Sequence, residues 1–307
     1  MPGGLQQHGA GRLRVMLVEG TGCGFLSQYA HALAQGLHDA GHRVLLVPGA
    51  DDELREWPVP FQKHSGVGRG LGGWAGLAAA VSRFRPDVVH FQWLGAPLAG
   101  LAFARWLRTH GRRVVYTPHN VLPHRRRWLS MPAYRAWYRG MDRVIARDPH
   151  IAWALEEMLG VSRNRIRLVT GNANCLGQRP GGRPPAELAR APAGIPRLLV
   201  FGHGGAGKNL DALLQAVDRE RRSCHLVLAG ERLDRGADRG LLQSLVERGR
   251  VTWIDRYIPA PEVPGLFRAC DLLVLPYRKL CRSPLLDLAA DLGLPVLRSE
   301  RVQGGQF

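Results

Sequence analysis

Short apolar runs alternate with longer segments of helical periodicity along most of the 307 residues. The first repeat of this pattern predicts a strand at 14–18, then a glycine-rich turn, a helix over 25–40 and a strand at 42–47. Gly41 favours helix termination, because glycine readily adopts the left-handed backbone of a helix end. A strand, a helix and a strand in this order are typical of a parallel sheet. The N-terminal part of the chain therefore predicts an α/β fold.

The same alternation continues toward the end of the chain. Further strands are predicted at 87–91, 113–117, 143–146, 165–169, 197–201, 225–229, 251–254, 272–275 and 295–298. Further helices are predicted at 74–84, 97–110, 150–159, 209–217, 239–248, 262–269 and 284–292. A segment rich in Pro, Gly and Arg, residues 177–196, interrupts the pattern and is typical of a linker. We predict two doubly wound domains, 1–176 and 197–307, that face each other across a ligand-binding cleft.

The charge adds an expectation about partners. The formal net charge is +17, and only three of the 42 basic residues are lysines. Such a protein is attracted to anionic partners. No known nucleic-acid-binding motif accompanies the charge, so we do not expect nucleic acid to be one of them. Five cysteines without a paired motif suggest a reducing compartment. Without a signal peptide or an apolar run of membrane-spanning length, we expect a cytoplasmic protein, with peripheral contact to the inner face of the membrane as an option.

Two positions in the first domain are candidates for ligand binding. Gly22 and Gly24 stand between the first strand and the first helix, where backbone N–H groups favour anions. A purely structural tight turn explains these glycines equally well. His119 follows the strand predicted at 113–117 and would stand at its carboxyl end. A histidine there can bind a ligand or transfer a proton, and the alternative is a structural role.

The second domain contains a glycine-rich loop that ends in a lysine. Gly202 to Lys208 has the spacing of a P-loop, Gly-x4-Gly-Lys, between a strand and a helix. Asn209 stands where a P-loop requires Ser or Thr to hold magnesium. Because the chain otherwise uses arginine, Lys208 suggests that a compact ammonium is needed at this place. A P-loop-like nucleoside triphosphatase remains an alternative.

Several longer motifs occur in a fixed order. They are Arg85-Pro86-Asp87-Val88-Val89-His90, the histidine-containing segment 116–124, the glycine-rich segment 199–211 and the segment 254–277. Over residues 12–300, this order resembles the GT-B glycosyltransferases of family 4. The resemblance implies two Rossmann-like domains. It also implies retaining transfer of a sugar, of the hexosyltransferase kind, from a nucleotide diphosphate donor, without a metal ion or another cofactor.

The resemblance also implies roles for individual residues. His119 is the candidate catalytic residue. The candidate donor-binding residues are Gly22, Gly24, Gly202, His203, Lys208, Tyr277 and Ser283. The acceptor implied is a glycan, a lipid-linked molecule or a small molecule, as in exopolysaccharide, cell-envelope glycan or natural-product biosynthesis.

A basic and aromatic segment of the first domain is the candidate for contact with an acceptor or a membrane. Its residues are Arg125, Arg126, Arg127 and Trp128. Basic and aromatic side chains together suit an anionic acceptor or a membrane interface. A solvated arginine-rich face is the alternative.

The chain departs from the family pattern in its second half. Leu280 and Leu288 occupy the positions of a glutamate pair that many family members use, and the arginine expected in the glycine-rich loop is replaced by His203 or Gly205. The sequence also ends before the last elements of the family fold, so we expect the second domain to be incomplete. A non-catalytic binding protein with the same fold therefore remains an alternative to the enzyme.

Overall fold

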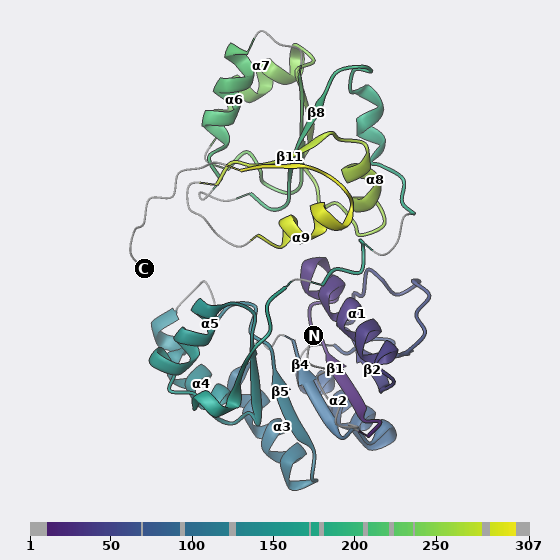
Figure 1. The fold of residues 1–307 in the computed structure, drawn as a ribbon, viewed down its shortest axis with the longest axis vertical. Coiled ribbons are helices and arrows are strands. Elements are labelled where there is room, and N and C mark those ends of the chain that lie inside the picture. The colour runs from purple at the N-terminus through teal and green to yellow at the C-terminus, as the bar shows by residue number, and fades with distance from the viewer. Residues whose placement is uncertain are drawn as a thin grey trace, which may run out of the picture. The chain divides into compact units, whose positions relative to one another are not determined.

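The structure is a computed structural model that describes residues 11–68, 70–92, 96–122, 127–171, 173–177, 181–204, 208–220, 224–235, 237–277 and 283–298. The chain forms two compact units, Met1–Ala173 and Asn174–Phe307. They can be told apart in Figure 1 by the colour change from purple and teal to green and yellow. Each unit has the α/β fold predicted from the sequence.

The first unit is built on a parallel sheet. Within the described residues the strand order is β3-β2-β1-β4-β5-β6-β7, with every pair parallel. The strands are β1 (Arg14–Val18), β2 (Arg43–Val47), β3 (Gln62–Lys63), β4 (Val88–Phe91), β5 (Arg113–Tyr116), β6 (Arg143–Ala146) and β7 (Ile166–Leu168). The sequence predicted all of these except β3, which is too short to produce a hydrophobic pattern.

Helices connect the strands of this sheet. They are α1 (Gly24–Asp39), α2 (Gly70–Phe84), α3 (Pro97–Thr109), α4 (Arg127–Arg139) and α5 (Pro149–Trp153), with a π-helical turn η1 (Ala154–Met158) and a 3-10 turn η2 (Arg163–Arg165). The sequence prediction missed α4, which contains Pro132. Its buried Tyr134, Trp137 and Tyr138 have the helical spacing that could have revealed it.

The core of the first unit lies on both faces of the sheet, because alternate strand residues point in opposite directions. Met16 and Val18 of β1 belong to the cluster formed with α2, α3 and α4. Val15 and Leu17 belong to the cluster formed with α1. Trp137 of α4 is fully buried, with its ring centroid 5.7 Å from that of Phe91 and 5.3 Å from that of Tyr116.

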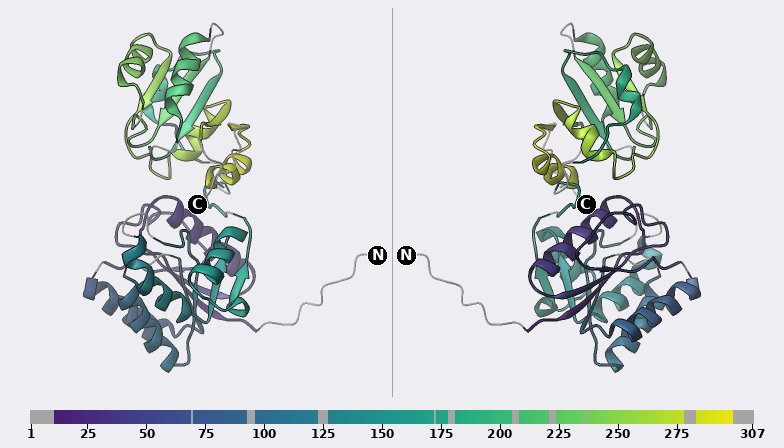
Figure 2. Two further views of the ribbon diagram at one scale, coloured as in Figure 1. Left: turned by 90° about the vertical axis from the view of Figure 1, so that its left-hand side faces the viewer. Right: turned by 90° about the vertical axis from the view of Figure 1, so that its right-hand side faces the viewer.

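The second unit contains a smaller parallel sheet in the order β10-β9-β8-β11-β12. Its strands are β8 (Arg197–Phe201), β9 (His225–Ala229), β10 (Val251–Ile254), β11 (Leu272–Leu275) and β12 (Val296–Arg298). Its helices are η3 (Ala186–Arg190, a 3-10 turn), α6 (Leu210–Arg219), α7 (Arg239–Glu247), α8 (Val263–Arg268) and α9 (Pro284–Asp291). Helices α6 and α7 cover one face of this sheet and α8 the other (Figure 1). Figure 2 allows the elements of each unit to be followed from two further sides.

The segment predicted as a linker, 177–196, packs against the second unit in its described part. Leu188 of η3 is buried. Glu187 Oε1 lies 2.8 Å from Nε of Arg256, whose guanidinium also contacts Glu262 Oε2 at 2.7 Å. These ion pairs attach η3 to the segments after β10.

Among the residues that the structure covers, none of the helices combines the length and the apolar composition that crossing a bilayer requires.

The aromatic core predicts a large stability effect. Trp137→Ala should lower the free energy of unfolding of the first unit by about 3–5 kcal/mol, because it removes a fully buried ring and leaves a cavity. Urea unfolding followed by circular dichroism measures the effect. Trp153→Ala is the matched control, since Trp153 is 49% exposed, and its effect should stay within about 0.5 kcal/mol. Equal effects of the two substitutions would contradict the packing described.

Candidate functional site

Both sheets reverse their strand order beside their first strand. The reversal lies between β1 and β4 in the first unit and between β8 and β11 in the second. In doubly wound α/β folds, ligands bind at the carboxyl ends of the strands at this point. Gly22 and Gly24 follow β1, whereas His119 follows β5, the neighbour of β4. Lys208 follows β8, and Tyr277 follows β11.

In the first unit, two acidic side chains, the buried Glu19 and the half-buried Glu53, organise the glycine-rich turn after β1. Glu19 is fully buried, and its carboxylate accepts hydrogen bonds from Thr21 N at 2.7 Å and Gly22 N at 2.9 Å. Gly24 N, at the start of α1, donates to Glu53 Oε1 at 2.8 Å. Burial raises the pKa of Glu19 above its ordinary value. The N–H groups proposed for anion binding are therefore already bonded to carboxylates of the chain.

The backbone of this turn requires glycine. Gly22 has φ of +75° and Gly24 has φ of +67°, values that side chains rarely adopt. A Cβ at Gly22 would also lie 3.0 Å from the carbonyl carbon of Asp51. This geometry agrees with the tight-turn explanation of the motif. Donor binding by Gly22 and Gly24 stays a prediction, and an incoming diphosphate would meet two carboxylates here.

His119, three residues beyond the end of β5, lies in a cluster drawn from four elements. Its Nδ1 lies 2.9 Å from Arg147 Nη1, and its Nε2 lies 3.4 Å from Gln92 Oε1. Arg147 follows β6 and Gln92 follows β4. The rings of Phe25 and Tyr29 on α1 contact the imidazole edge-on, with centroids 6.3 and 5.2 Å away. The cluster places a partly buried histidine at the carboxyl edge of the sheet, as predicted from its position in the sequence.

The surroundings of His119 favour the neutral imidazole. Burial, then the charge of Arg147, then His90 lower the pKa of His119 to about 3. His90 on β4 is itself buried, and burial lowers its pKa to about 4. His90 Nε2 is 2.8 Å from the hydroxyl oxygen of Thr117. Both histidines are therefore neutral at physiological pH.

Sequence reasoning missed four polar residues of this edge: Gln92, Arg147, Glu19 and Glu53. A signal existed for three of them. Glu19, Gln92 and Arg147 each come directly after a strand, as the first residue beyond β1, β4 and β6. In a parallel sheet such positions gather at one edge. Glu53 lies in an irregular segment, and the sequence pattern offered no means of placing it beside α1.

In the second unit, Lys208 lies at the reversal point. Its Nζ donates to the carbonyl oxygen of Phe201, the last residue of β8, at 3.1 Å. Its backbone forms an antiparallel bridge with Tyr277. Asn209 N adds a hydrogen bond of 2.6 Å to Pro276 O. The loop after β8 is thus tied to the end of β11.

The ammonium of Lys208 is partly buried, and burial lowers its pKa to about 8. Among the residues that the structure describes, no carboxylate lies within ion-pairing distance of Lys208. At neutral pH the group is therefore still mostly charged and, as far as the description extends, lacks a counterion. Such a group is suited to hold an anion.

The other glycine-loop candidates differ in their surroundings. Gly202 has φ of +102°, and a Cβ at Gly230 would lie 2.2 Å from Gly202 O, so two backbone segments meet closely here. A Cβ at Gly202 would stand 3.6 Å from Lys208 Nζ. The His203 side chain is exposed, with Nδ1 3.9 Å from Glu231 Oε2. Gly202 and Lys208 are therefore neighbours, whereas the His203 ring faces solvent and a carboxylate.

Ser283 and Tyr277 are brought together beside α9. The hydroxyl oxygens of the two residues are 3.4 Å apart. Ser283 is buried, and its hydroxyl caps α9 by accepting from Leu285 N at 3.3 Å. Leu288, at one position of the family glutamate pair, is buried. Leu280, at the other position, lies outside the described residues.

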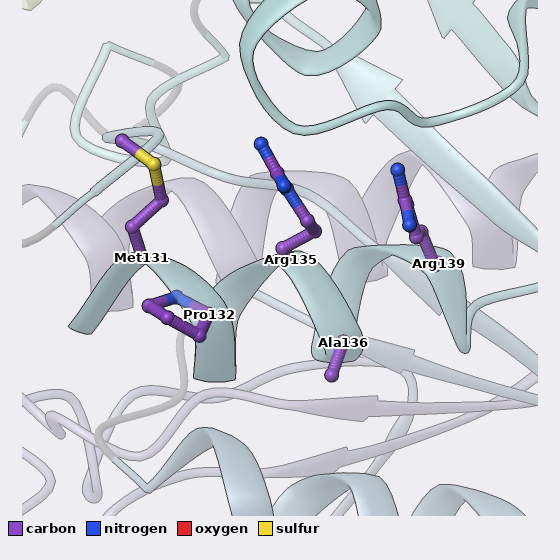
Figure 3. Close-up of a pocket in the computed structure, with 5 residues that line it drawn as sticks. All are labelled: Met131, Pro132, Arg135, Ala136 and Arg139. Carbon is purple, nitrogen blue, oxygen red and sulfur yellow. The ribbon is translucent and has the colours of Figure 1, made fainter. Parts of the chain in front are cut away.

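The basic segment can be described only in part. Arg125 and Arg126 lie outside the described residues. The backbone of Arg127 and Trp128 is described as part of α4, but their side chains are not. Farther along α4, Met131, Arg135 and Arg139 project from one side of the helix (Figure 3) and line a cavity of about 240 Å³. Arg135 Nη2 donates to Met158 O at 2.8 Å, and Arg139 Nε donates to the carbonyl oxygen of Gly160 at 3.0 Å. Within the described residues neither arginine has an ion-pair partner, so this face keeps its positive charge.

Sequence and structure comparisons agree with the resemblance. Residues 26–170 match the family described as Glycosyltransferase Family 4. None of the curated proteins compared matches the chain in sequence. Among solved structures, the Anabaena protein HepE in complex with UDP-glucose is similar over 94% of this chain and 81% of its own, with a TM-score of 0.67 and 16% identity. The chain is a GT-B protein that resembles the glycosyltransferases of family 4.

Other GT-B structures are similar to a comparable extent. Sucrose-phosphate synthase from Thermosynechococcus elongatus has a TM-score of 0.63 and 18% identity, covering 94% of this chain and 82% of its own. UDP-GlcNAc 2-epimerase from Methanocaldococcus jannaschii has a TM-score of 0.60 and 15% identity, covering 93% and 83%. At these identities the likeness establishes the GT-B fold. Because an epimerase is among the matches, the fold alone does not select the reaction.

The burial of Lys208 predicts how stability depends on pH. Its pKa is about 8 in the folded GT-B chain, against an ordinary value of 10.5. Between these values the unfolded chain binds more protons than the folded one, so this group makes the folded state more stable as pH rises. Lys208→Met should therefore be more stable than the wild type at about pH 7.5 and lose much of that advantage at about pH 10. Thermal unfolding of both proteins measures this, and an advantage independent of pH would contradict the burial of a charged lysine.

Proposed function

We propose that this chain transfers a sugar from a nucleotide diphosphate donor to an acceptor hydroxyl, without a metal ion or another cofactor. The observation that carries the proposal is the ammonium of Lys208 at the reversal point of the second sheet, in a chain whose first unit matches family 4 glycosyltransferases. The similarity to HepE, which was solved with UDP-glucose, supports a nucleotide sugar as the donor class.

Lys208 would act on the leaving diphosphate. Cleavage of the bond between sugar and phosphate leaves negative charge on the nucleotide, and a preorganised positive group stabilises that charge as it develops. The hydrogen bond to Phe201 O fixes Nζ at the end of β8. A Cβ at Gly202 would stand 3.6 Å from Nζ, so glycine backbone lies beside the ammonium, and Gly230 packs closely against Gly202. A phosphate group can therefore approach Lys208 without a side chain from either position in the way.

The first unit would hold the acceptor and the transferred sugar. The carboxylates of Glu19 and Glu53 at its glycine-rich turn disfavour a diphosphate and suit hydroxyl groups. His119 would orient a sugar or acceptor hydroxyl. Retention of the anomeric configuration is the outcome that the family resemblance favours. Biosynthesis of cell-envelope glycans, exopolysaccharides or natural products is the proposed setting.

A non-catalytic binding protein is the second candidate. The observation that favours it is Leu288, whose apolar side chain is buried where many family members carry a carboxylate. A P-loop-like nucleoside triphosphatase has less support. Asn209 is bonded through its backbone to the end of β11, and α6 begins only after it, at Leu210. Lys208 thus forms an isolated backbone bridge with Tyr277 and does not belong to the first turn of a helix.

The proposal predicts that Lys208→Ala loses about 10²- to 10³-fold in turnover, because one charge-stabilising contact to the leaving group is removed. Release of nucleoside diphosphate from the best of a panel of UDP-, GDP- and dTDP-sugars is the measurement. Lys208→Arg should recover part of the activity, since it keeps the positive charge but replaces the compact ammonium by a planar guanidinium.

The matched control is Arg219→Ala. Arg219 ends α6, the helix that follows Lys208, and is exposed, so this variant makes the same charge change away from the loop. It should keep wild-type turnover. Equal losses in the Lys208 and Arg219 variants, or no loss in either, would exclude a specific role for Lys208.

We further propose that the basic face of α4 attaches the protein peripherally to anionic membranes. Arg135→Ser combined with Arg139→Ser should weaken binding to vesicles that contain phosphatidylglycerol by about 1 kcal/mol for each arginine. Arg219→Ser combined with Arg235→Ser removes the same charge from the second unit and should have little effect. Sedimentation with these vesicles and with neutral phosphatidylcholine vesicles measures the difference. Equal wild-type binding to both lipids would rule out an electrostatic attachment.

A further inference from the structure

The hydrogen-bond partners of His119 determine where its proton lies. Its Nδ1 faces Arg147 Nη1 at 2.9 Å. A guanidinium has only donors and stays protonated in proteins. Nδ1 must therefore accept this hydrogen bond and carry no proton. The neutral ring then carries its proton on Nε2, which faces Gln92 Oε1.

We propose that Arg147 is a positioning residue that, together with burial, keeps His119 neutral and fixes its proton on Nε2. In this form His119 can donate a hydrogen bond to a bound hydroxyl, but it cannot serve as a general base. Nε2 already holds a proton, and the lone pair of Nδ1 accepts the hydrogen bond from the guanidinium of Arg147. Donation from His119 to a bound hydroxyl rests on the proposed glycosyl transfer, whereas the protonation state of the imidazole does not.

Arg147 is itself held firmly in place. It is buried, and its Nη2 donates to the carbonyl oxygen of Gly171 at 3.1 Å. Its guanidinium carbon lies 4.2 Å from the ring centroid of Tyr29 and 5.5 Å from that of Phe25. Cation–π contacts of this kind stabilise a buried positive charge. Because the same two rings also contact His119, α1 fixes the guanidinium and the imidazole relative to each other.

On the side opposite Arg147, the imidazole of His119 faces Gln92, which in turn contacts His90. Gln92 Nε2 lies 3.1 Å from His90 Nε2, so its amide can donate to that nitrogen. With the amide group turned toward His90, the carbonyl oxygen of Gln92 faces His119 and accepts from Nε2–H. Arg147 Nη1, His119 Nε2 and Gln92 Nε2 then each face an acceptor in this series. The contact between His119 and Gln92 is long, at 3.4 Å, so a ligand oxygen can compete for this N–H.

The charged and titratable groups around His119 act in the same direction. Arg147 after β6, His90 on β4 and Tyr29 on α1 face the ring, and Arg147 and His90 both lower its pKa. No carboxylate among the described residues contributes to this pKa. Protonation of Nδ1 would also direct an N–H at the guanidinium. His119 should therefore stay neutral from about pH 5 to about pH 8, a range in which ordinary histidines titrate.

Nitrogen-15 NMR of histidine-labelled full-length protein tests the proposal without any substrate. The side-chain spectrum distinguishes a protonated from an unprotonated ring nitrogen, and the signals of His119 are assigned by their loss in His119→Gln. We expect a wild-type ring with unprotonated Nδ1 and protonated Nε2 at all pH values between about 5 and 8. A wild-type ring that carries its proton on Nδ1, or that titrates near the ordinary pKa, would overturn the proposal.

Variants then identify Arg147 as the cause. Arg147→Met removes the charge and the donor, and the pKa of His119 should rise by about 1 to 3, the effect expected of one adjacent charge. Arg147→Lys keeps both and should restore the low pKa and the Nε2–H form. The control is Arg143→Met, an exposed arginine at the start of β6, which should leave the signals of His119 unchanged.

Two outcomes of the variants would refute the role of Arg147. One is a folded Arg147→Met protein whose His119 signals equal those of the wild type. The other is an equal change in the Arg143→Met protein. If Arg147→Met does not fold, Arg147→Lys decides, since loss of the Nε2–H form despite a retained charge and donor contradicts the proposal. Failure of the Lys208 turnover experiment would leave these spectra unaffected, so the two hypotheses fail separately.

Discussion

Every strand in both sheets runs parallel to its neighbours, so the carboxyl ends of each sheet share one edge. The placement of all the candidate groups depends on this constraint. In the first unit it brings the turn after β1, Gln92, His119 and Arg147 to one edge, although these positions are spread over about half of the chain. In the second unit it brings Lys208 beside Tyr277. Neither cluster requires residues that are near in sequence, because the crossover helices return each strand to the same starting side.

The two edges differ in their electrostatics, and this difference supports the proposed division of ligands between them. The turn of the first unit is held by Glu19 and Glu53, and its cationic group, Arg147, is buried against aromatic rings. The loop of the second unit presents Lys208 beside glycine backbone without a described carboxylate partner. An anionic diphosphate therefore suits the second unit, and neutral hydroxyl groups suit the first. Keeping His119 neutral agrees with this division, since an imidazolium would attract the diphosphate to the acceptor side.

Most strands and helices could be predicted because a buried strand and an amphipathic helix leave distinct periods in the sequence. The exceptions have physical reasons: β3 has two residues, and the basic side chains of α4 hid the spacing of Tyr134, Trp137 and Tyr138. The positions of His119 and Lys208 at strand ends were also predictable. Their protonation was not, because it depends on burial and on Arg147, a partner 28 residues from His119. Likewise, the sequence predicted an anion site at the glycine turn but could not reveal that Glu19 and Glu53 accept hydrogen bonds from the amides of Gly22 and Gly24.

We propose that this chain binds a nucleotide sugar through the second unit and needs no metal to do so. Calorimetric titration of the wild-type protein with UDP-, GDP- and dTDP-sugars, in buffer with a chelator of divalent cations, tests it most directly. We expect one nucleotide class to bind at a single site under these conditions. Absence of binding by every donor would contradict the claim and favour the non-catalytic alternative, and binding that appears only after magnesium is added would contradict metal independence.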